Sequence, residues 1–232
     1  MNLRDLISKI ISDEEYKQSL LDYAVDNSST RKKPSQIFEE RLFKLLQPEY
    51  TELKAEEFKQ KNSFKYLKGI FSNKAISDEI IDYAGDLTDL TDDKTIIYQP
   101  FGSQKFPDIL IINGTKVIPF EMKSGKGDRP TWNQGLPVDP GVYIFARIDE
   151  EKNNFDATVF MGRDILPNEV KQKLVTLVNN YRKELAKNGA EITADFDVYL
   201  REMYNQKTSI INRNNRHDLE QEVFSYLSKH DI

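Results

Sequence analysis

Residues 106–123, FPDILIINGTKVIPFEMK, constrain the fold more than any other stretch of this chain. Two apolar runs flank Asn113-Gly114, and Asn-Gly in that setting is a strong hairpin signal, because a type I′ turn needs positive φ at both central residues. Both runs are apolar at consecutive positions, as expected for strands that are covered on both faces. The sequence therefore predicts a buried hairpin within a sheet that lies between layers of helices.

Strand signals continue on both sides of this hairpin. From Thr95 onward, clusters of Gly, Pro, Asn and Asp separate five short runs, which read TIIYQ, DILII, KVIPFEM, VYIFARI and ATVFM. Residues 1–94 are mainly helical by periodicity, with one or two amphipathic helices in 1–25, a further helix at QIFEERLFKLL and a polar helical stretch over 51–93. The pattern predicts an α/β (α+β) fold with a central mixed five-stranded sheet flanked by helices.

The C-terminal part is expected to be helical again. PNEVKQKLVTLVNNYRKELAKNG predicts a long helix with Gly189 just past its end, and DLEQEVFSYLSKH predicts a closing helix with Asp218 as its N-cap. We therefore expect a single domain over residues 1–232. Its sheet core spans 95–165 and its C-terminal helical part spans 166–232.

Composition excludes several kinds of chemistry. The chain has no cysteine, so disulfides, thiolate zinc sites and cysteine nucleophiles are ruled out. Its two histidines, His217 and His230, both lie in the last sixteen residues, which argues against a histidine-based triad or metal site. A chain of 232 residues is long enough to bury one sizeable core.

The sequence also bears on location and partners. Acidic residues interrupt the apolar pattern of residues 1–20, which a secretory signal or transit peptide would not tolerate, and no run is long and uncharged enough to span a membrane. We expect a cytoplasmic protein. The net charge of −5 argues weakly against a nucleic-acid partner. Seven of the 38 acidic residues form one run, interpreted as a solvated face: Asp78, Glu79, Asp82, Asp86, Asp89, Asp92 and Asp93.

The hairpin places acids and a lysine on one face. With Asn-Gly as the two-residue loop, Asp108 pairs with Pro119. Because side chains alternate along a strand, Glu121 and Lys123 then share the face of Asp108. Asp108 and Glu121 become diagonal neighbours, about 7 to 8 Å apart at the backbone.

Two carboxylates at that separation can bind one divalent cation. Mg²⁺ takes oxygen ligands and keeps several waters, so Asp108, Glu121 and the backbone carbonyl of Met122 would suffice. A water on the metal would become the nucleophile. Lys123 would orient or deprotonate that water, or neutralise charge on a phosphate.

Two alternatives stay open at this point. Proline sits badly inside a paired strand except at an edge or bulge, and a bulge at Pro119 would shift the register by one residue. The three charged residues Asp108, Glu121 and Lys123 could also be a surface ion cluster at a strand end.

Pro107-Asp108 followed by Glu121-Met122-Lys123 resembles the signature of the PD-(D/E)XK nuclease superfamily. The flanking text, YQPFGSQKFPDILI and EMKSGKGDRPTWNQGLP, is similar to the core of type II restriction endonucleases, including an Asn and a Pro after the lysine. The resemblance covers residues 95–147 and a helical element upstream. It implies a restriction-endonuclease-like fold and Mg²⁺-dependent hydrolysis of double-stranded DNA.

The resemblance also implies a catalytic glutamate on a helix that precedes the sheet. In QIFEERLFKLL, at 100° per residue, Glu39 falls at the edge of the arc that holds Phe38 and Leu42, whereas Glu40 points away. Glu39 is the better candidate. The two adjacent glutamates leave the assignment open, and so does a solvated role for Glu39.

Candidate DNA contacts follow the lysine and recur near the C-terminus. Lys126 and Arg129 are placed to meet phosphates, and Asn133 either braces the catalytic loop or touches DNA, with bracing favoured. Residues 205–218, NQKTSIINRNNRHD, are rich in side chains that can bind base edges, although an ordinary polar loop has the same composition. The candidates in this segment are Arg213, Asn214, Asn215 and Arg216.

Two further features give no candidate site. Trp132, the one tryptophan of the chain, is expected to be a packing anchor. SGKGDR, residues 124–129, lacks the spacing and ending of a phosphate-binding loop, so no nucleotide cofactor is expected.

The sequence thus predicts a sequence-specific, Mg²⁺-dependent endonuclease. One chain carries one set of acids and lysine, so a double-strand break favours a homodimer on a palindromic site. The alternatives are a repair or junction-resolving nuclease of the same superfamily, and a DNA-binding protein without catalytic activity.

Overall fold

The computed structural model describes residues 1–72, 89–90, 94–103, 105–114, 116–133, 135–149, 151–192 and 203–229. Most of the acidic run, and His230, lie outside the described residues. Asp89 is described, and it is not simply a solvated acid: its Oδ2 accepts the backbone N–H groups of Asn62 (2.5 Å) and Ser63 (3.3 Å). Asp89 therefore caps the first turn of helix α5 (Asn62–Ser72).

The main sheet is mixed, as predicted, and has the order β1-β2-β3-β4-β6-β7. Its strands are β1 (Thr51–Glu52), β2 (Lys94–Tyr98), β3 (Ile109–Asn113), β4 (Lys116–Gly125), β6 (Val142–Asp149) and β7 (Asn154–Met161). β1 pairs with β2 and β4 pairs with β6 in parallel, and the other neighbours are antiparallel.

The prediction of five strands was wrong by one. The extra strand, β1, is only two residues long and lies inside the stretch predicted to be helical. A two-residue strand carries no periodicity, so only its pairing with β2 defines it.

The register of the hairpin differs from the expected one by two residues. Asn113 pairs with Lys116, and Ile109 pairs with Phe120 rather than with Ile118. Asn113 and Lys116 therefore flank the connection, in which Gly114 supplies a positive φ of +59°. Because the shift is an even number, every side chain stays on its predicted face.

Pro119 does not introduce a bulge. It pairs with Leu110 in a continuous ladder between β3 and β4. Pairing between β4 and β6 begins one residue later, at Phe120 and Val142. Pro119 thus lies where β4 has one neighbour, so its missing N–H interrupts no second ladder.

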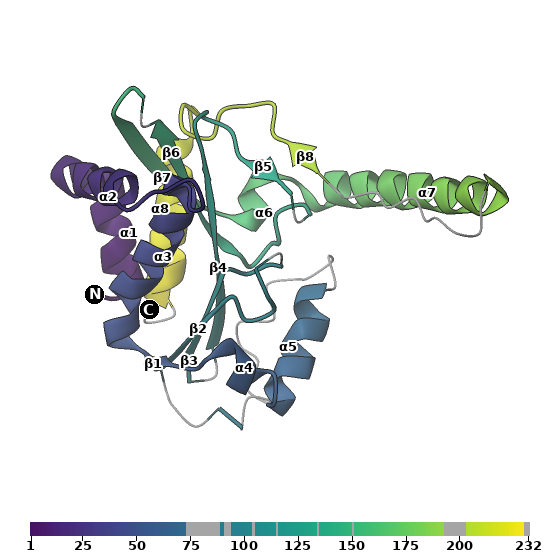
Figure 1. Ribbon diagram of the computed structural model, residues 1–232, viewed down its shortest axis with the longest axis horizontal. Helices are drawn as coiled ribbons and strands as arrows, with labels where there is room; N and C mark the ends of the chain where they lie inside the picture. The colour runs from purple at the N-terminus through teal and green to yellow at the C-terminus, as the bar shows by residue number, and fades with distance from the viewer. Residues whose placement is uncertain are drawn as a thin grey trace.

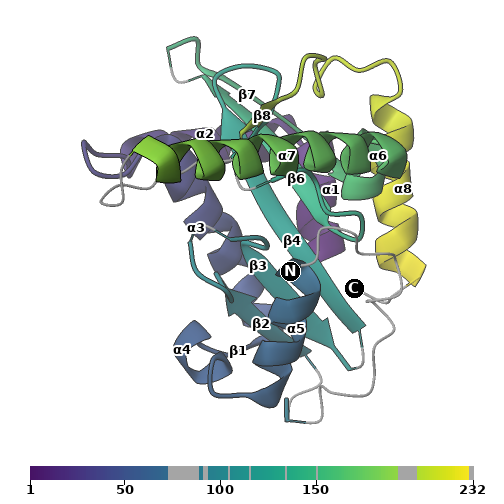
Figure 2. The ribbon, with the colours of Figure 1, turned by 90° about the vertical axis from the view of Figure 1, so that its right-hand side faces the viewer.

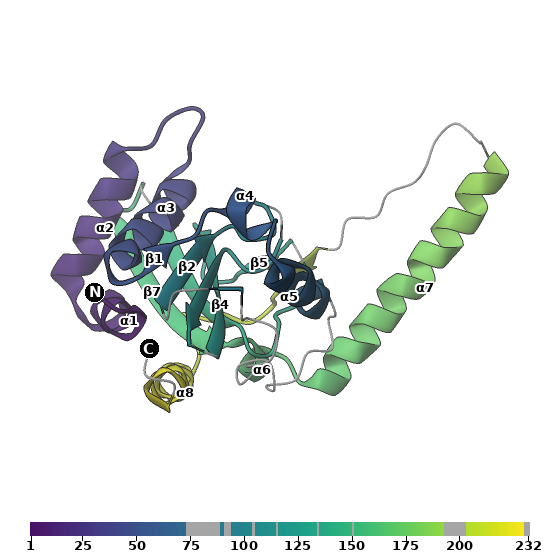
Figure 3. The ribbon, with the colours of Figure 1, turned by 90° about the horizontal axis from the view of Figure 1, so that it is seen from below.

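Helices cover both faces of the sheet, with α1–α3 and α8 on one side and α4 and α5 on the other (Figures 1 and 3). The described helices are α1 (Leu3–Ser12), α2 (Glu14–Asp26), α3 (Pro34–Leu46), η1 (Gln47–Glu49), α4 (Ala55–Phe58), α5, α6 (Gly162–Ile165), α7 (Asn168–Ile192) and α8 (Arg216–Lys229). The prediction of helices on both faces is confirmed.

Each face has its own core. On the side of α1–α3 and α8, Ile109, Phe120 and Met122 join one buried cluster, whereas Leu110 and Ile112 join a second cluster beneath α4 and α5. Successive residues of these strands thus pack on opposite faces of the sheet, as the alternation of side chains along a strand requires.

A third cluster surrounds Trp132, which is 3% exposed. Its ring lies edge-on to Tyr143 and Phe160, at 5.4 and 6.4 Å between centroids, and Ile210 and Ile211 complete the cluster. The prediction of a packing anchor is confirmed. The cluster also holds the segment before α8 against the sheet.

Two predicted helix ends need correction. The long helix α7 continues through Gly189 to Ile192, so this glycine is not its stop signal. α8 begins at Arg216, which places Asp218 in the first turn rather than at the N-cap. Within the described parts of the chain, no helix has both the length and the apolar character that a membrane span requires.

Candidate active site

The candidate site lies where β3 stops beside a longer β4. β3 pairs with β4 only as far as Phe120, whereas β4 continues along β6 to Gly125. From Glu121 onward, the β3 side of β4 is therefore open within the sheet. Asp108, the residue before β3, lies at this opening.

Side chains replace the missing backbone ladder at the opening. The N–H of Asp108 donates to Oε2 of Glu121 (3.0 Å), and the N–H of Met122 donates to Oδ2 of Asp108 (2.8 Å). The N–H of Gln99 donates to the carbonyl of Asp108 (2.7 Å). These three bonds fix both the backbone and the carboxylate of Asp108.

Lys123 completes the cluster. Its Nζ lies 2.5 Å from Oε1 of Glu121, and the two side chains are 11% and 1% exposed. The structure therefore brings Asp108, Glu121 and Lys123 together. Asp108 and Glu121 are both buried, so the alternative of a surface ion cluster does not hold.

Burial dominates the electrostatics of the acids. It raises the pKa of Glu121 to about 7; Asp108 raises this pKa further, and Lys123 opposes the rise. Burial also raises the pKa of Asp108, against the N–H of Met122 and the charge of Lys123. For Lys123, burial works against the charged form, yet Glu121, Asp108 and Glu39 hold its pKa above the ordinary value. Lys123 is thus a cation near neutral pH.

The structure separates the two candidate glutamates of α3. Burial raises the pKa of Glu39 to about 8, and repulsion from Asp108 and Glu121 adds to the rise, so Glu39 belongs to the same electrostatic cluster. Glu40 instead pairs with Lys32, at 2.6 Å between Nζ and Oε1. Of the two, Glu39 is the glutamate that is coupled to the acids of the site.

Sequence reasoning did not single out two neighbours of the cluster. Burial raises the pKa of Tyr98 to about 12, with further contributions from Glu39 and Asp108. Gln99 adopts a left-handed backbone, φ +46°, which is uncommon outside glycine. Neither residue has a periodicity signal, since both lie where β2 ends. A cleft of 280 Å³ beside them is lined by residues that include Lys54, Lys59 and Gly102.

The donor chemistry fits Mg²⁺. Asp108 and Glu121 are buried beside one ammonium, Glu39 is half-buried and coupled to both by repulsion, and burial raises the pKa of all three carboxyl groups. Among the described residues, no three Asp, Glu, His or Cys side chains form a ready metal cage. Mg²⁺ commonly uses one or two carboxylates and keeps its waters. Asp108 and Glu121, with the Met122 carbonyl, would hold it.

The two groups of candidate DNA contacts lie side by side. The N–H of Ile210 donates to the carbonyl of Asp128 (2.9 Å), and β5 (Thr131–Trp132) pairs with β8 (Tyr204–Asn205). The loop after Lys123 is thereby joined to residues 203–216. Within these segments the exposed candidates are Lys126, Arg129, Asn133, Asn214 and Asn215, and Arg213 is half-buried.

Two exposed cations of this surface have acidic partners in the chain. Nζ of Lys126 lies 2.8 Å from Oε1 of Glu151, and Nε of Arg129 lies 3.3 Å from Oδ1 of Asp128. Exposed pairs of this kind contribute little to stability. Both side chains can therefore exchange these partners for phosphates at low cost.

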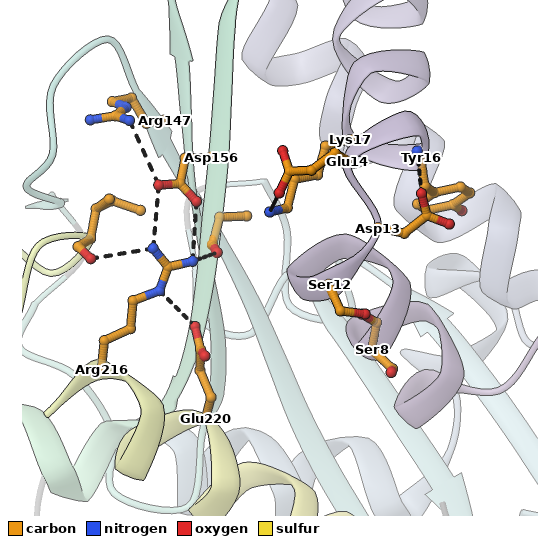
Figure 4. Close-up of polar contacts among 12 residues, drawn as sticks. Ser8, Ser12, Asp13, Glu14, Tyr16, Lys17, Arg147, Asp156, Arg216 and Glu220 are labelled. Atoms are coloured by element: carbon orange, nitrogen blue, oxygen red, sulfur yellow. Dashed lines mark hydrogen bonds and ion pairs between the residues drawn. The ribbon is translucent and has the colours of Figure 1, made fainter.

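The prediction for Arg216 needs correction, because its guanidinium group binds other residues of the protein (Figure 4). Nη2 lies 3.1 Å from Oδ1 of Asp156 and donates to the carbonyl of Ala157 (2.6 Å), and Nε donates to Oε1 of Glu220 (2.8 Å). These bonds tie α8 to β7. The predicted contact between Arg216 and a base is incompatible with this arrangement, whereas Arg213 makes no ion pair within the described residues.

Comparison of the chain with protein-family models, with curated proteins and with solved structures finds no significant match.

The raised pKa of Glu39 predicts a pH-dependent stability in the absence of divalent cations. The unfolded chain releases this proton near pH 4.5 and the folded chain near pH 8, so stability is lost as the pH rises across that window. Glu39→Gln removes the ionisation. We expect its melting temperature at pH 8 in EDTA to exceed that of the wild type by at least about 2 °C, and the gain to vanish below pH 4.5.

Glu40→Gln is the matched control, because it removes only the partially exposed pair with Lys32. Its melting temperature should follow the wild type at every pH. Equal behaviour of the two variants would contradict the placement of Glu39 in the buried cluster.

Proposed function

We propose that this protein is a Mg²⁺-dependent endonuclease that hydrolyses phosphodiester bonds in double-stranded DNA, as a type II restriction enzyme does. The observation that carries the proposal is the buried cluster of Asp108, Glu121 and Lys123, with Glu39 coupled to it. The resemblance of the same residues to the PD-(D/E)XK signature supports it. We further propose that the sheet is a restriction-endonuclease-like core, in a cytoplasmic protein.

The proposed reaction is attack of a water oxygen on phosphorus, with cleavage of the bond to the leaving sugar oxygen. Bound Mg²⁺ would polarise the phosphate and acidify water. Asp108 is held in place by the bonds to Gln99 and Met122 and presents its carboxylate at the opening beside β4. Glu121 accepts the N–H of Asp108 at Oε2 and binds the ammonium of Lys123 at Oε1.

The raised pKa of Lys123 favours one of its possible roles. A lysine that stays protonated near neutral pH is a hydrogen-bond donor and a positive charge, not a base. Lys123 would orient the attacking water and stabilise the charge that develops on the phosphate. Glu39, which is coupled to Asp108 and Glu121, is the candidate for proton exchange with water.

Substrate would lie over the surface formed by residues 124–133 and 203–215. Lys126 and Arg129 would bind phosphates there, with Asn133 bracing the loop, and the polar segment with Arg213, Asn214 and Asn215 would read base edges. The hydrogen bond between Ile210 and Asp128 supports one continuous surface that begins beside the catalytic lysine.

The cleavage prediction uses purified protein and phage DNA. With Mg²⁺ we expect discrete fragments, and with EDTA no cleavage. Lys123→Ala should lower the single-turnover rate by about 100- to 1,000-fold, the usual cost of removing one group that stabilises transition-state charge. DNA binding in Ca²⁺, which supports binding but positions water poorly, should persist in this variant.

Lys44→Ala is the control, because Lys44 is an exposed lysine in the last turn of α3. This variant should cleave like the wild type. Undiminished cleavage in EDTA would refute the metal-dependent mechanism. Nicking of branched or damaged DNA alone would favour a repair or junction-resolving nuclease, and binding without cleavage would favour the inactive DNA-binding alternative.

Arg213 and Arg216 should respond differently to substitution by alanine. Arg213→Ala should weaken discrimination at one base pair by about 1 to 3 kcal/mol while leaving the melting temperature unchanged. Arg216→Ala should lower the melting temperature, because it removes the bonds to Asp156 and Glu220 that tie α8 to β7. The two quantities are measured by competition binding in Ca²⁺ and by thermal denaturation. A reversed pattern would contradict the assignment.

A further inference from the structure

Helix α7 extends away from the body of the molecule (Figures 1 and 3), and in the view of Figure 2 it crosses in front of the sheet. It has 25 residues and is therefore about 37 Å long. Its first turns are anchored: Nζ of Lys171 pairs with the carboxylate of Asp139, both side chains being nearly buried, and lies 3.4 Å from the carbonyl of Gly162. A buried pair fixes direction more than it adds stability. The projection of α7 is therefore a built feature of the fold.

An apolar stripe runs along the projecting part of this helix. At 100° per residue its members fall within an arc of about 100°. Leu177 is 66% exposed, Tyr181 is 54% exposed and Val170 is 39% exposed. The stripe consists of Val170, Leu174, Leu177, Val178, Tyr181 and Leu185. Leu174, Val178 and Leu185 are half-buried. An apolar stripe with exposed residues along its length marks an interaction site.

The stripe is complementary to itself in an antiparallel arrangement. Two copies related by a twofold axis between residues 177 and 178 bring each stripe residue opposite another stripe residue. The pairs that lie at the same level along the axis are Val170 with Leu185, Leu174 with Tyr181, and Leu177 with Val178. A surface that matches its own symmetry mate is what a twofold dimer interface requires.

Charges beside the stripe have the same self-complementarity. Lys173 and Glu184 lie just beyond the same edge of the stripe, at helical angles about 20° apart. In the antiparallel arrangement this edge faces its own copy, and Lys173 lies within about 3 Å, along the axis, of the position opposite Glu184. Opposite charges therefore meet twice across the interface.

We propose that α7 is the dimerisation element of this protein and pairs antiparallel with α7 of a second copy. The proposal rests on the stripe and its flanking charges and not on the nuclease activity. Apolar residues on both sides would exclude water along the axis, and the two pairs of Lys173 with Glu184 would set the orientation.

Single cysteines test the geometry directly, because the chain has none of its own. Val178→Cys places the two thiols within about 1.5 Å of one another along the axis, whereas Val170→Cys places them about 22 Å apart. Disulfides need Cα atoms within about 7 Å. We expect Val178→Cys to give a cross-linked dimer under mild oxidation, on a non-reducing gel, and Val170→Cys to give none.

The outcome of the cross-linking separates the alternatives. Cross-linking of both variants would show a parallel arrangement and overturn the antiparallel proposal. Cross-linking of neither would show that α7 does not pair with a second copy. Both substitutions replace a valine of the same stripe, so a difference between them cannot arise from exposure alone.

Sedimentation measures the contribution of the stripe. We expect Leu177→Glu to weaken dimerisation at least about tenfold, since a charge would replace a central apolar contact. Thr176→Glu, an exposed position on the opposite side of α7, should leave it unchanged. Lys173→Glu should weaken the dimer, and Lys173→Glu with Glu184→Lys should restore it. A monomeric wild type, or a dimer insensitive to Leu177→Glu, would overturn the proposal.

Discussion

The structure depends on two hydrogen bonds that close the gap where β3 ends beside β4. The N–H of Asp108 binds the carboxylate of Glu121, and the N–H of Met122 binds the carboxylate of Asp108. Without them, two backbone donors would be buried and unsatisfied, at a cost of about 1 to 3 kcal/mol each. The same bonds draw both acids into the interior of the sheet. The fold and the candidate chemistry therefore have one origin, since satisfying the backbone at this point requires buried carboxylates.

Burial of these carboxylates leaves their surroundings short of positive charge. Lys123 balances one negative charge, but Glu39, Asp108 and Glu121 together supply up to three, and burial holds the pKa of each above its ordinary value. Buried acids of this kind rarely stabilise a fold, because well-packed hydrophobic residues in the same space are often at least as stabilising. Groups of perturbed acids around one lysine are instead typical of functional sites. A divalent cation would supply the missing positive charge and order the opening beside β4.

The sequence predicted those parts of the fold that depend on periodicity. The strand faces followed from alternation, and they survived a register error of two residues because that error was an even number. The grouping of Asp108, Glu121 and Lys123 followed from the same rule. Glu39 was preferred over Glu40 by its helical angle alone, and the electrostatic coupling of Glu39 to the cluster supports that choice.

Features that depend on tertiary contacts could not be predicted in this way. Arg216 was grouped with Arg213 by composition, but its partners Asp156 and Glu220 lie on β7 and α8, and only the packed structure brings them together. Strand β1 is defined by its neighbour, and Asp89 is defined by the helix that it caps. Gln99 has a positive φ that its residue type does not suggest. In each case a distant segment decides the role of the residue.

The most direct test of the central claim is a crystal structure of the protein with Mn²⁺, with data collected for the anomalous signal of manganese. Mn²⁺ is a suitable probe because it shares the oxygen ligands of Mg²⁺. The account predicts an anomalous peak at the opening beside β4, in contact with the carboxylates of Asp108 and Glu121 and the carbonyl of Met122. The peak should be absent from Asp108→Asn. A wild-type structure in which Mn²⁺ binds elsewhere, while this opening holds no metal, would contradict the account.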